Sequence, residues 1–194
     1  MMPTALIFDC DGTLADTMPL HYKAWRATLD PLGLSFPTSE FYRLAGMPTA
    51  AIVAQLAEEQ GVEVDVQRVC AERDERFDSM VLEVRPVAPV VAIAREHRGR
   101  LPMAVASGST RTTVLRTLDT LGIRDWFGAI VTAEDTERHK PEPDVFLEAA
   151  RRLGVEAAGC RVFEDGDLGL EAARRAGMEG VDIRLLSGVI SPGS

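Results

Sequence analysis

The sequence predicts an α/β fold, with a doubly wound, Rossmann-like parallel sheet core and an inserted α-helical cap. Short apolar runs alternate with longer amphipathic stretches, and this alternation is typical of parallel strands that are buried on both faces and joined by helices. One long helical segment interrupts the alternation directly after the first apolar run. The chain has 194 residues, which is enough for one core with a modest insertion.

Five short apolar runs are predicted to be the strands of the sheet. They lie at residues 5–8, 103–106, 129–132, 161–163 and 181–183. The amphipathic stretches between them are predicted helices, at residues 87–96, 110–121, 143–153 and 168–176. Three of these helices are followed by a glycine where a left-handed C-terminal cap is expected: Gly122, Gly154 and Gly177.

The segment from residue 16 to residue 83 contains no convincing strand. Helical patterns recur in it at residues 20–29, 38–44, 49–59 and 66–81, separated by prolines and glycines. We therefore predict a catalytic α/β core formed by residues 1–15 and 84–194, and an α-helical cap formed by residues 16–83. Hinges are expected near residues 14–17 and 84–89, and the polar tail from Ser187 is expected to fray.

The composition excludes several classes of protein. Apolar residues make up 46% of the chain and charged residues 26%, which is typical of a globular protein. The net charge of −9 argues against nucleic acid or an anionic membrane as a partner, and no apolar run approaches the roughly 20 residues of a membrane span. The three scattered cysteines and the lack of a basic leader predict a reduced, cytoplasmic protein.

Acidic residues follow the first and the fourth predicted strands. Asp9 and Asp11 end the first apolar run in the motif Asp-Cys-Asp-Gly-Thr, and Glu164 and Asp165 end the fourth. Ligands of open parallel sheets bind at these strand ends, and a hard cation such as Mg²⁺ prefers carboxylate oxygens. Taken singly, each motif has a simpler explanation, because Asp-Gly is a common turn dipeptide and acids also cap helices.

Donor groups follow the second and the third predicted strands. Residues 107–110, Ser-Gly-Ser-Thr, open a helix whose backbone N–H groups and hydroxyls can bind an anion, although an ordinary N-cap is the alternative. Lys140 lies just before the next predicted helix. Only two of the 21 basic residues are lysines, so this lysine favours a specific role over a solvated surface position.

All four clusters are expected to meet at one edge of the sheet, because the carboxyl ends of parallel strands lie together. That edge would hold several carboxylates, one ammonium group, and hydroxyl and amide donors. Phosphoryl transfer needs this set, which supplies a nucleophile, ligands for a divalent metal and positive charge on the phosphoryl oxygens. The four clusters together therefore predict a phosphoryl-transfer site.

With these motifs in this order, the chain resembles the haloacid dehalogenase superfamily of aspartate-nucleophile phosphotransferases over essentially its whole length. It is most similar to the β-phosphoglucomutase-like branch, and within it to the fructose-1-phosphate and 6-phosphogluconate phosphatase subgroup. Three stretches carry this similarity: His-Tyr-Lys-Ala-Trp at 21–25, Ala-Gly-Met-Pro-Thr at 45–49, and the segment 163–178 that begins Phe-Glu-Asp-Gly-Asp. The resemblance also implies a monomer.

The resemblance implies a role for each residue of the four motifs. Asp9 would be the nucleophile that becomes an aspartyl phosphate. Asp11 would protonate the leaving alcohol and then activate the attacking water. Ser107, with Gly108, would hold the transferring phosphoryl group, and Lys140 would neutralise its oxygens and the Asp9 carboxylate.

Mg²⁺ is the cofactor that the resemblance implies. Its ligands would be Asp9, Asp11 through its backbone carbonyl, Glu164 and Asp165. Thr13 would support Asp9, whereas Thr17 would contact either Asp11 or the substrate. His21 has a role near Asp11 and plain packing as even alternatives, and for Trp25 packing within the cap is favoured.

The resemblance implies Mg²⁺-dependent hydrolysis of a small sugar phosphate monoester, since a helical lid excludes large substrates. Asp11 favours esters over halides, because a halide leaving group needs no proton. The mutases hold a second phosphate with a Lys and an Arg in the cap loop, where Ala45 and Thr49 stand here. Mutase-type phosphoryl transfer stays the alternative, because Arg43 lies near this loop. A non-catalytic binding protein of the same fold is disfavoured, because no catalytic acid or lysine is missing.

Overall fold

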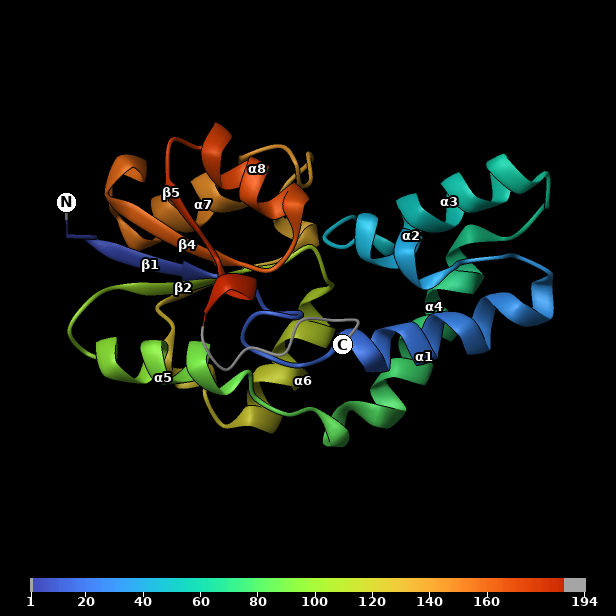
Figure 1. The fold of residues 1–194 in the computed structure, drawn as a ribbon, viewed down its shortest axis with the longest axis horizontal. Coiled ribbons are helices and arrows are strands. Elements are labelled where there is room, and N and C mark those ends of the chain that lie inside the picture. Colours follow the sequence, from blue (N-terminus) through green and yellow to red (C-terminus); the bar gives the residue numbers. More distant parts are fainter. Residues whose placement is uncertain (1, 187–194) are drawn as a thin grey trace.

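Five parallel strands form the sheet of the core, in the order β3–β2–β1–β4–β5 (Figure 1). Their bounds are Ala5–Phe8 (β1), Met103–Ala106 (β2), Ala129–Val131 (β3), Cys160–Glu164 (β4) and Glu179–Asp182 (β5). The computed structural model describes residues 2–186, so the tail from Ser187 lies outside the described residues. The predicted α/β fold class is confirmed.

The predicted strands are correct in place. The bounds of β3 differ from the prediction by one residue at one end and those of β4 by one residue at each end, and the fifth strand is displaced. The prediction started at Val181, whereas β5 begins two residues earlier, at Glu179, and ends at Asp182. Glu179 pairs with Arg161 of β4 in the sheet, and their side chains form an ion pair of 2.9 Å. Because β5 is an edge strand, its first half is exposed and carries no apolar signal.

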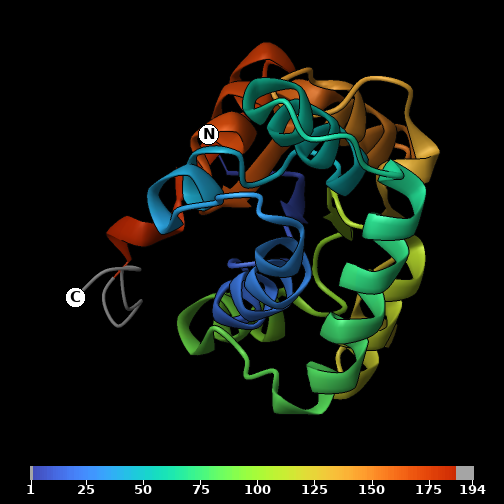
Figure 2. The same ribbon diagram turned by 90° about the vertical axis from the view of Figure 1, so that its right-hand side faces the viewer.

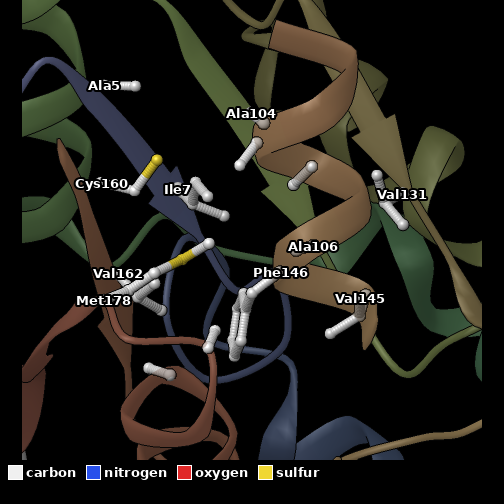
Figure 3. Packing of buried hydrophobic residues seen from close by; sticks show 14 of the residues in the cluster. Ala5, Ile7, Ala104, Ala106, Val131, Val145, Phe146, Cys160, Val162 and Met178 are labelled. Carbon is white, nitrogen blue, oxygen red and sulfur yellow. The ribbon is translucent and has the colours of Figure 1, made fainter. Parts of the chain in front are cut away.

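Helices cover both faces of the sheet (Figure 1). Their bounds are Ala88–His97 (α5), Arg111–Leu121 (α6), Asp144–Leu153 (α7) and Asp167–Arg175 (α8). Successive residues of β1 alternate between the two faces, as the pleat of a strand requires. Ile7 packs in one apolar cluster with Phe146 of α7, as Figure 3 shows, and Phe8 packs in the other with Val90 of α5. Strand β1 is therefore fixed in register by two cores.

Four helices follow β1 and form a separate body beside the sheet (Figures 1 and 2). They are Met18–Leu29 (α1), Thr38–Arg43 (α2), Thr49–Gln60 (α3) and Val66–Met80 (α4). All four were predicted, and α1 begins two residues earlier than expected because Pro19 fits the first turn of a helix. These helices have a core of their own, in which Trp25, Phe36 and Phe41 pack edge to face. None of the described helices is long and apolar enough to cross a membrane.

Two adjacent chain segments join this helical body to the sheet. The Asp16 amide donates to the Arg85 carbonyl at 2.8 Å, and the Val87 amide donates to the Leu14 carbonyl at 3.0 Å. Ala15 and Pro86 form an isolated antiparallel bridge between these two bonds. The segments that lead into and out of the helical body therefore run side by side.

Candidate active site

The predicted site residues meet where the chain order of the sheet reverses. The chain runs from β1 to β2 on one side of the sheet and later returns to place β4 on the other side of β1. Asp9 follows β1 and Asp165 follows β4, so they flank the crevice at which open α/β sheets bind ligands. A pocket opens there between the sheet edge and the helical body, whose wall includes Trp25 and Met47.

Lys140 lies between two carboxylates at the bottom of this site. Its Nζ donates to Asp9 Oδ1 at 2.6 Å and to Glu164 Oε1 at 2.7 Å. All three side chains are buried, with 3% of Lys140, 5% of Asp9 and 3% of Glu164 exposed. An ammonium group held by two buried carboxylates supports the predicted special role of this lysine rather than a solvated surface position.

Burial and charge shift the pKa values of this group in a consistent way. Burial raises the pKa of Asp9 well above its usual value, although the charge of Lys140 partly opposes the shift. Burial works against the charge of Lys140, but Asp9 and Glu164 raise the pKa of the ammonium above its usual range. The lysine therefore stays protonated, and the surrounding acids remain short of positive charge.

Three carboxylates form a cluster that can hold a cation. Ligand oxygens of Asp9, Glu164 and Asp165 all lie within 4.8 Å of one another. Burial, together with the charge of Glu164, raises the pKa of Asp165 to about 7. A divalent cation with carboxylate ligands fits this uncompensated negative charge. The Asp11 carboxylate does not belong to this cluster, and only its backbone carbonyl was expected to bind the metal.

Thr13 contacts a different acid from the one expected. The family resemblance implied that its hydroxyl supports Asp9, but Thr13 donates to Asp165 Oδ1 at 2.8 Å. The reason is that Asp165 lies directly against the Asp-Gly-Thr turn. A Cβ on Gly12, whose φ is +83°, would lie 2.7 Å from Asp165 Cγ, so only glycine leaves room for this approach.

The Asp11 carboxylate accepts hydrogen bonds on both oxygens. Thr17 donates to Oδ1 at 2.8 Å and His21 Nε2 lies 2.9 Å from the same oxygen, so both residues contact Asp11. Oδ2 accepts from Ser109 at 2.6 Å and from Ser107 at 3.3 Å. Burial opposes the charge of Asp11, but His21, Ser109 and Thr17 hold its pKa below the usual value. Ser109 was not singled out from the sequence, although it stands two residues after Ser107.

Arg73 fixes the tautomer of His21. Its guanidinium, on α4, donates to His21 Nδ1, so the imidazole proton lies on Nε2 and points to Asp11. Burial and the charge of Arg73 lower the pKa of His21, and the imidazole stacks on Phe77 with centroids 4.0 Å apart. Arg73 was not predicted from the sequence, because nothing distinguishes it among the 19 arginines of the chain.

The loop between α2 and α3 closes directly onto the sheet edge. A Cβ on Gly108 would lie 3.2 Å from the carbonyl carbon of Gly46 and closer still to its oxygen. Ala45 of this loop and Thr49, the first residue of α3, line the pocket, as does Gly108. Arg43, which kept the mutase alternative open, is exposed and pairs with Glu40 at 2.9 Å.

The doubly wound sheet, the inserted helices and the acidic pocket between them define the class of this protein, an α/β enzyme with an inserted helical body. Within that class, the chain belongs to the haloacid dehalogenase-like hydrolases, whose family model matches residues 6–183. The predicted family is therefore confirmed.

Curated and solved relatives agree with this membership. The chain is 42% identical to the fructose-1-phosphate phosphatase YqaB of Escherichia coli, over 93% of this chain and 96% of that one. It is 29% identical to a phosphorylated carbohydrates phosphatase of Thermotoga maritima, over 85% of this chain and 77% of that one. The β-phosphoglucomutase of Clostridium difficile superposes with a TM-score of 0.83 at 26% identity, over 92% of this chain and 83% of that one. The family match and the two phosphatases confirm the predicted enzyme class, a phosphatase of the haloacid dehalogenase type.

Proposed function

We propose that this protein hydrolyses a small sugar phosphate monoester through an aspartyl phosphate on Asp9, with Mg²⁺ as its cofactor. The observation that carries the proposal is the buried contact of Lys140 with Asp9, in a cluster of three acids that this one ammonium group neutralises only in part. A buried carboxylate held at one oxygen by an ammonium group leaves its other oxygen free to act as a nucleophile.

The metal would be held by Asp9, Glu164, Asp165 and the backbone carbonyl of Asp11. Bound Mg²⁺ supplies positive charge to the phosphoryl oxygens and reduces their repulsion by the attacking carboxylate. The raised pKa values of Asp9 and Asp165 support this assignment, because burial and neighbouring acids disfavour their charged forms and a bound cation would offset both effects.

In the first step Asp9 attacks phosphorus, and the bond from phosphorus to the sugar oxygen breaks. Asp11 gives a proton to that oxygen, so the sugar leaves as a neutral alcohol. Because the pKa of Asp11 lies below its usual value in the substrate-free protein, Asp11 must take up this proton when the substrate binds. Ser107 and the backbone at Gly108 hold the transferred group, and Lys140 offsets the charge on its oxygens. In the second step Asp11 takes a proton from water, which attacks the aspartyl phosphate and releases inorganic phosphate.

Hydrolysis is favoured over mutase-type transfer by the charges of the pocket wall. Arg73 is the only Lys or Arg among the described residues that line the pocket, and its guanidinium already contacts His21 and Asp74. A bisphosphate intermediate needs a free cation for its second phosphate. The sugar end of a monoester carries no second phosphate, so it needs only contacts to its hydroxyl groups.

Fructose 1-phosphate is the first substrate to test, because the relative that is 42% identical is named for it. We would compare it with 6-phosphogluconate, β-glucose 1-phosphate and an aryl phosphate, each with Mg²⁺ and with EDTA. Metal-dependent phosphate release from a sugar monoester supports the proposal. Conversion of β-glucose 1-phosphate to glucose 6-phosphate without phosphate release contradicts it and favours the mutase.

The nucleophile is tested by Asp9→Asn, which is expected to abolish phosphate release while the circular dichroism spectrum stays native. Retained turnover would contradict the covalent mechanism. We further propose that residues 16–83 act as the cap and that the protein works as a cytoplasmic monomer without nucleic acid or membrane. Light scattering after size-exclusion chromatography tests the monomer.

A further inference from the structure

We propose that Gly169 is a positioning residue of the active site, because its missing side chain leaves the space that the Glu164 carboxylate needs to reach Lys140. The inference rests on the proposed function of the site. It concerns the first turn of α8, a part of the acidic motif for which the mechanism above gives no role.

Gly169 lies directly against the side chain of Glu164. It is the third residue of α8 and is buried. A Cβ at this position would lie 2.7 Å from Glu164 Cγ and closer still to the carboxyl group. Non-bonded carbon atoms in proteins do not approach one another this closely, so any side chain at residue 169 would displace Glu164.

Glu164 cannot move without losing both of its hydrogen bonds. Its Oε1 accepts from Lys140 Nζ at 2.7 Å, and its Oε2 accepts from the backbone amide of Gly166 at 2.7 Å. Displacement of the carboxylate would remove one of the two anions that hold the Lys140 ammonium. The position of that ammonium beside Asp9 would then change.

Backbone conformation does not explain the glycine. Gly169 is not among the described glycines with positive φ, so an alanine would fit its backbone. Alanine is also the better helix former, which means that glycine weakens α8 locally. The close approach of Glu164 is therefore what requires glycine here.

The experiment is a double-mutant cycle of Gly169→Ala and Glu164→Ala. Glu164→Ala removes the three atoms that lie nearest to the new methyl group, which are Oε1, Cδ and Cγ of Glu164. We measure kcat and KM for phosphate release, and the thermal unfolding midpoint of the metal-free protein. Gly180→Ala is the matched control, because its methyl group would make an ordinary 3.4 Å contact with Leu170 outside the site.

Gly169→Ala alone is expected to lower kcat about 100-fold, the scale of a 1 Å misplacement, with KM changed less than about threefold. It should also lower the unfolding midpoint. In the Glu164→Ala background the same change should leave kcat within about threefold. It should raise the midpoint there, because alanine fills the emptied space. Gly180→Ala should stay within about twofold of the parent in kcat.

Two results would overturn the inference. One is a wild-type kcat in Gly169→Ala. The other is that Gly169→Ala lowers kcat and the unfolding midpoint by the same amounts in the Glu164→Ala background as in the wild-type protein. If Gly169→Ala alone does not fold, a folded double variant supports the inference and an unfolded one refutes it. The unfolding cycle needs no turnover, so it remains valid even if Asp9→Asn contradicts the proposed mechanism.

Discussion

The Lys140 ammonium and the Asp9 carboxylate form a buried ion pair, with Nζ 2.6 Å from Oδ1. Glu164 shares the same ammonium, so one cation serves two anions in a site that holds a third acid, Asp165. The balance of charge in the site therefore depends on Lys140, and this dependence leads to the first prediction.

Lys140→Met is expected to lower kcat about 1000-fold, the effect of losing one strong donor to the transition state. It should also lower the free energy of unfolding of the metal-free protein by about 3 kcal/mol at pH 8. The loss should be smaller at pH 5, because acids with raised pKa values are protonated there and need no partner. Urea unfolding at both pH values checks this.

The matched control for that prediction is Lys23→Met, at the other lysine of the chain, which is exposed on α1. It should leave activity and stability nearly unchanged. An equal loss of stability at pH 5 and pH 8 in Lys140→Met would mean that the ammonium does not compensate the buried acids.

His21 is predicted to be a neutral imidazole that carries its proton on Nε2 at pH 6.5. Burial and the charge of Arg73 lower its pKa, and Arg73 occupies Nδ1. Nitrogen-15 NMR of the imidazole reads the tautomer and the pKa directly. Arg73→Gln removes the nearby charge and should raise the pKa of His21. A protonated imidazole in the wild-type protein at this pH would contradict the assignment.

Mg²⁺ binding is predicted to weaken as the pH falls below about 7. The pKa of Asp165 in the metal-free protein is raised to about 7, so a proton competes with the cation below that pH. One displaced proton corresponds to about a tenfold loss of affinity per pH unit. Calorimetric titration at pH 6 and pH 8 measures this loss.

Asp165→Asn is predicted to raise the stability of the metal-free protein while abolishing Mg²⁺ binding. The raised pKa means that folding favours the protonated carboxyl, so the contribution of Asp165 to stability is lost as pH rises from about 4 to about 7. The variant should therefore unfold less readily than the wild type at pH 8 without metal, by roughly 1–3 kcal/mol, while losing Mg²⁺ binding. The control is Asp167→Asn, at a highly exposed acid. Unchanged Mg²⁺ affinity in Asp165→Asn would remove this residue from the metal site.

Gly108→Ala is predicted to hold the α2–α3 loop away from the sheet edge. The new methyl group would meet the carbonyl of Gly46, so the loop would have to move outward. We expect KM to rise about tenfold, since substrate contacts made by the closed loop are lost. Gly128→Ala, whose methyl group would lie 3.4 Å from a Leu153 methyl group, is the control. An unchanged KM would show that the loop adapts to the methyl group.

The sequence was sufficient to predict the elements and the residues at the strand ends. Buried strands such as β1 and β2 were located without error, because every residue in them is apolar and turn residues bound them. The acids, Lys140 and Ser107 were found because the parallel topology itself brings strand ends together. The predicted bounds of the edge strand β5 were displaced, because half of this strand faces solvent and lacks an apolar pattern.

Partners of side chains were much harder to predict. Thr13 was assigned to Asp9, yet the positive φ of Gly12 brings Asp165 against the Thr13 hydroxyl instead. Arg73 reaches His21 from a helix more than 50 residues away, and no local pattern encodes such a contact. Contacts of this kind follow from tertiary packing, which the periodicity of the sequence does not describe.

The bridge between Ala15 and Pro86 also bears on the history of this enzyme. A chain that enters and leaves a structural unit at one point can lose or exchange that unit while the rest of the chain keeps its path. All five strands and their pairings lie outside the inserted helices. Evolution could therefore replace the inserted helices, which form one wall of the pocket, while keeping the strand ends that hold Asp9 and Asp165. The same junction offers protein engineers a single place at which to graft a new specificity.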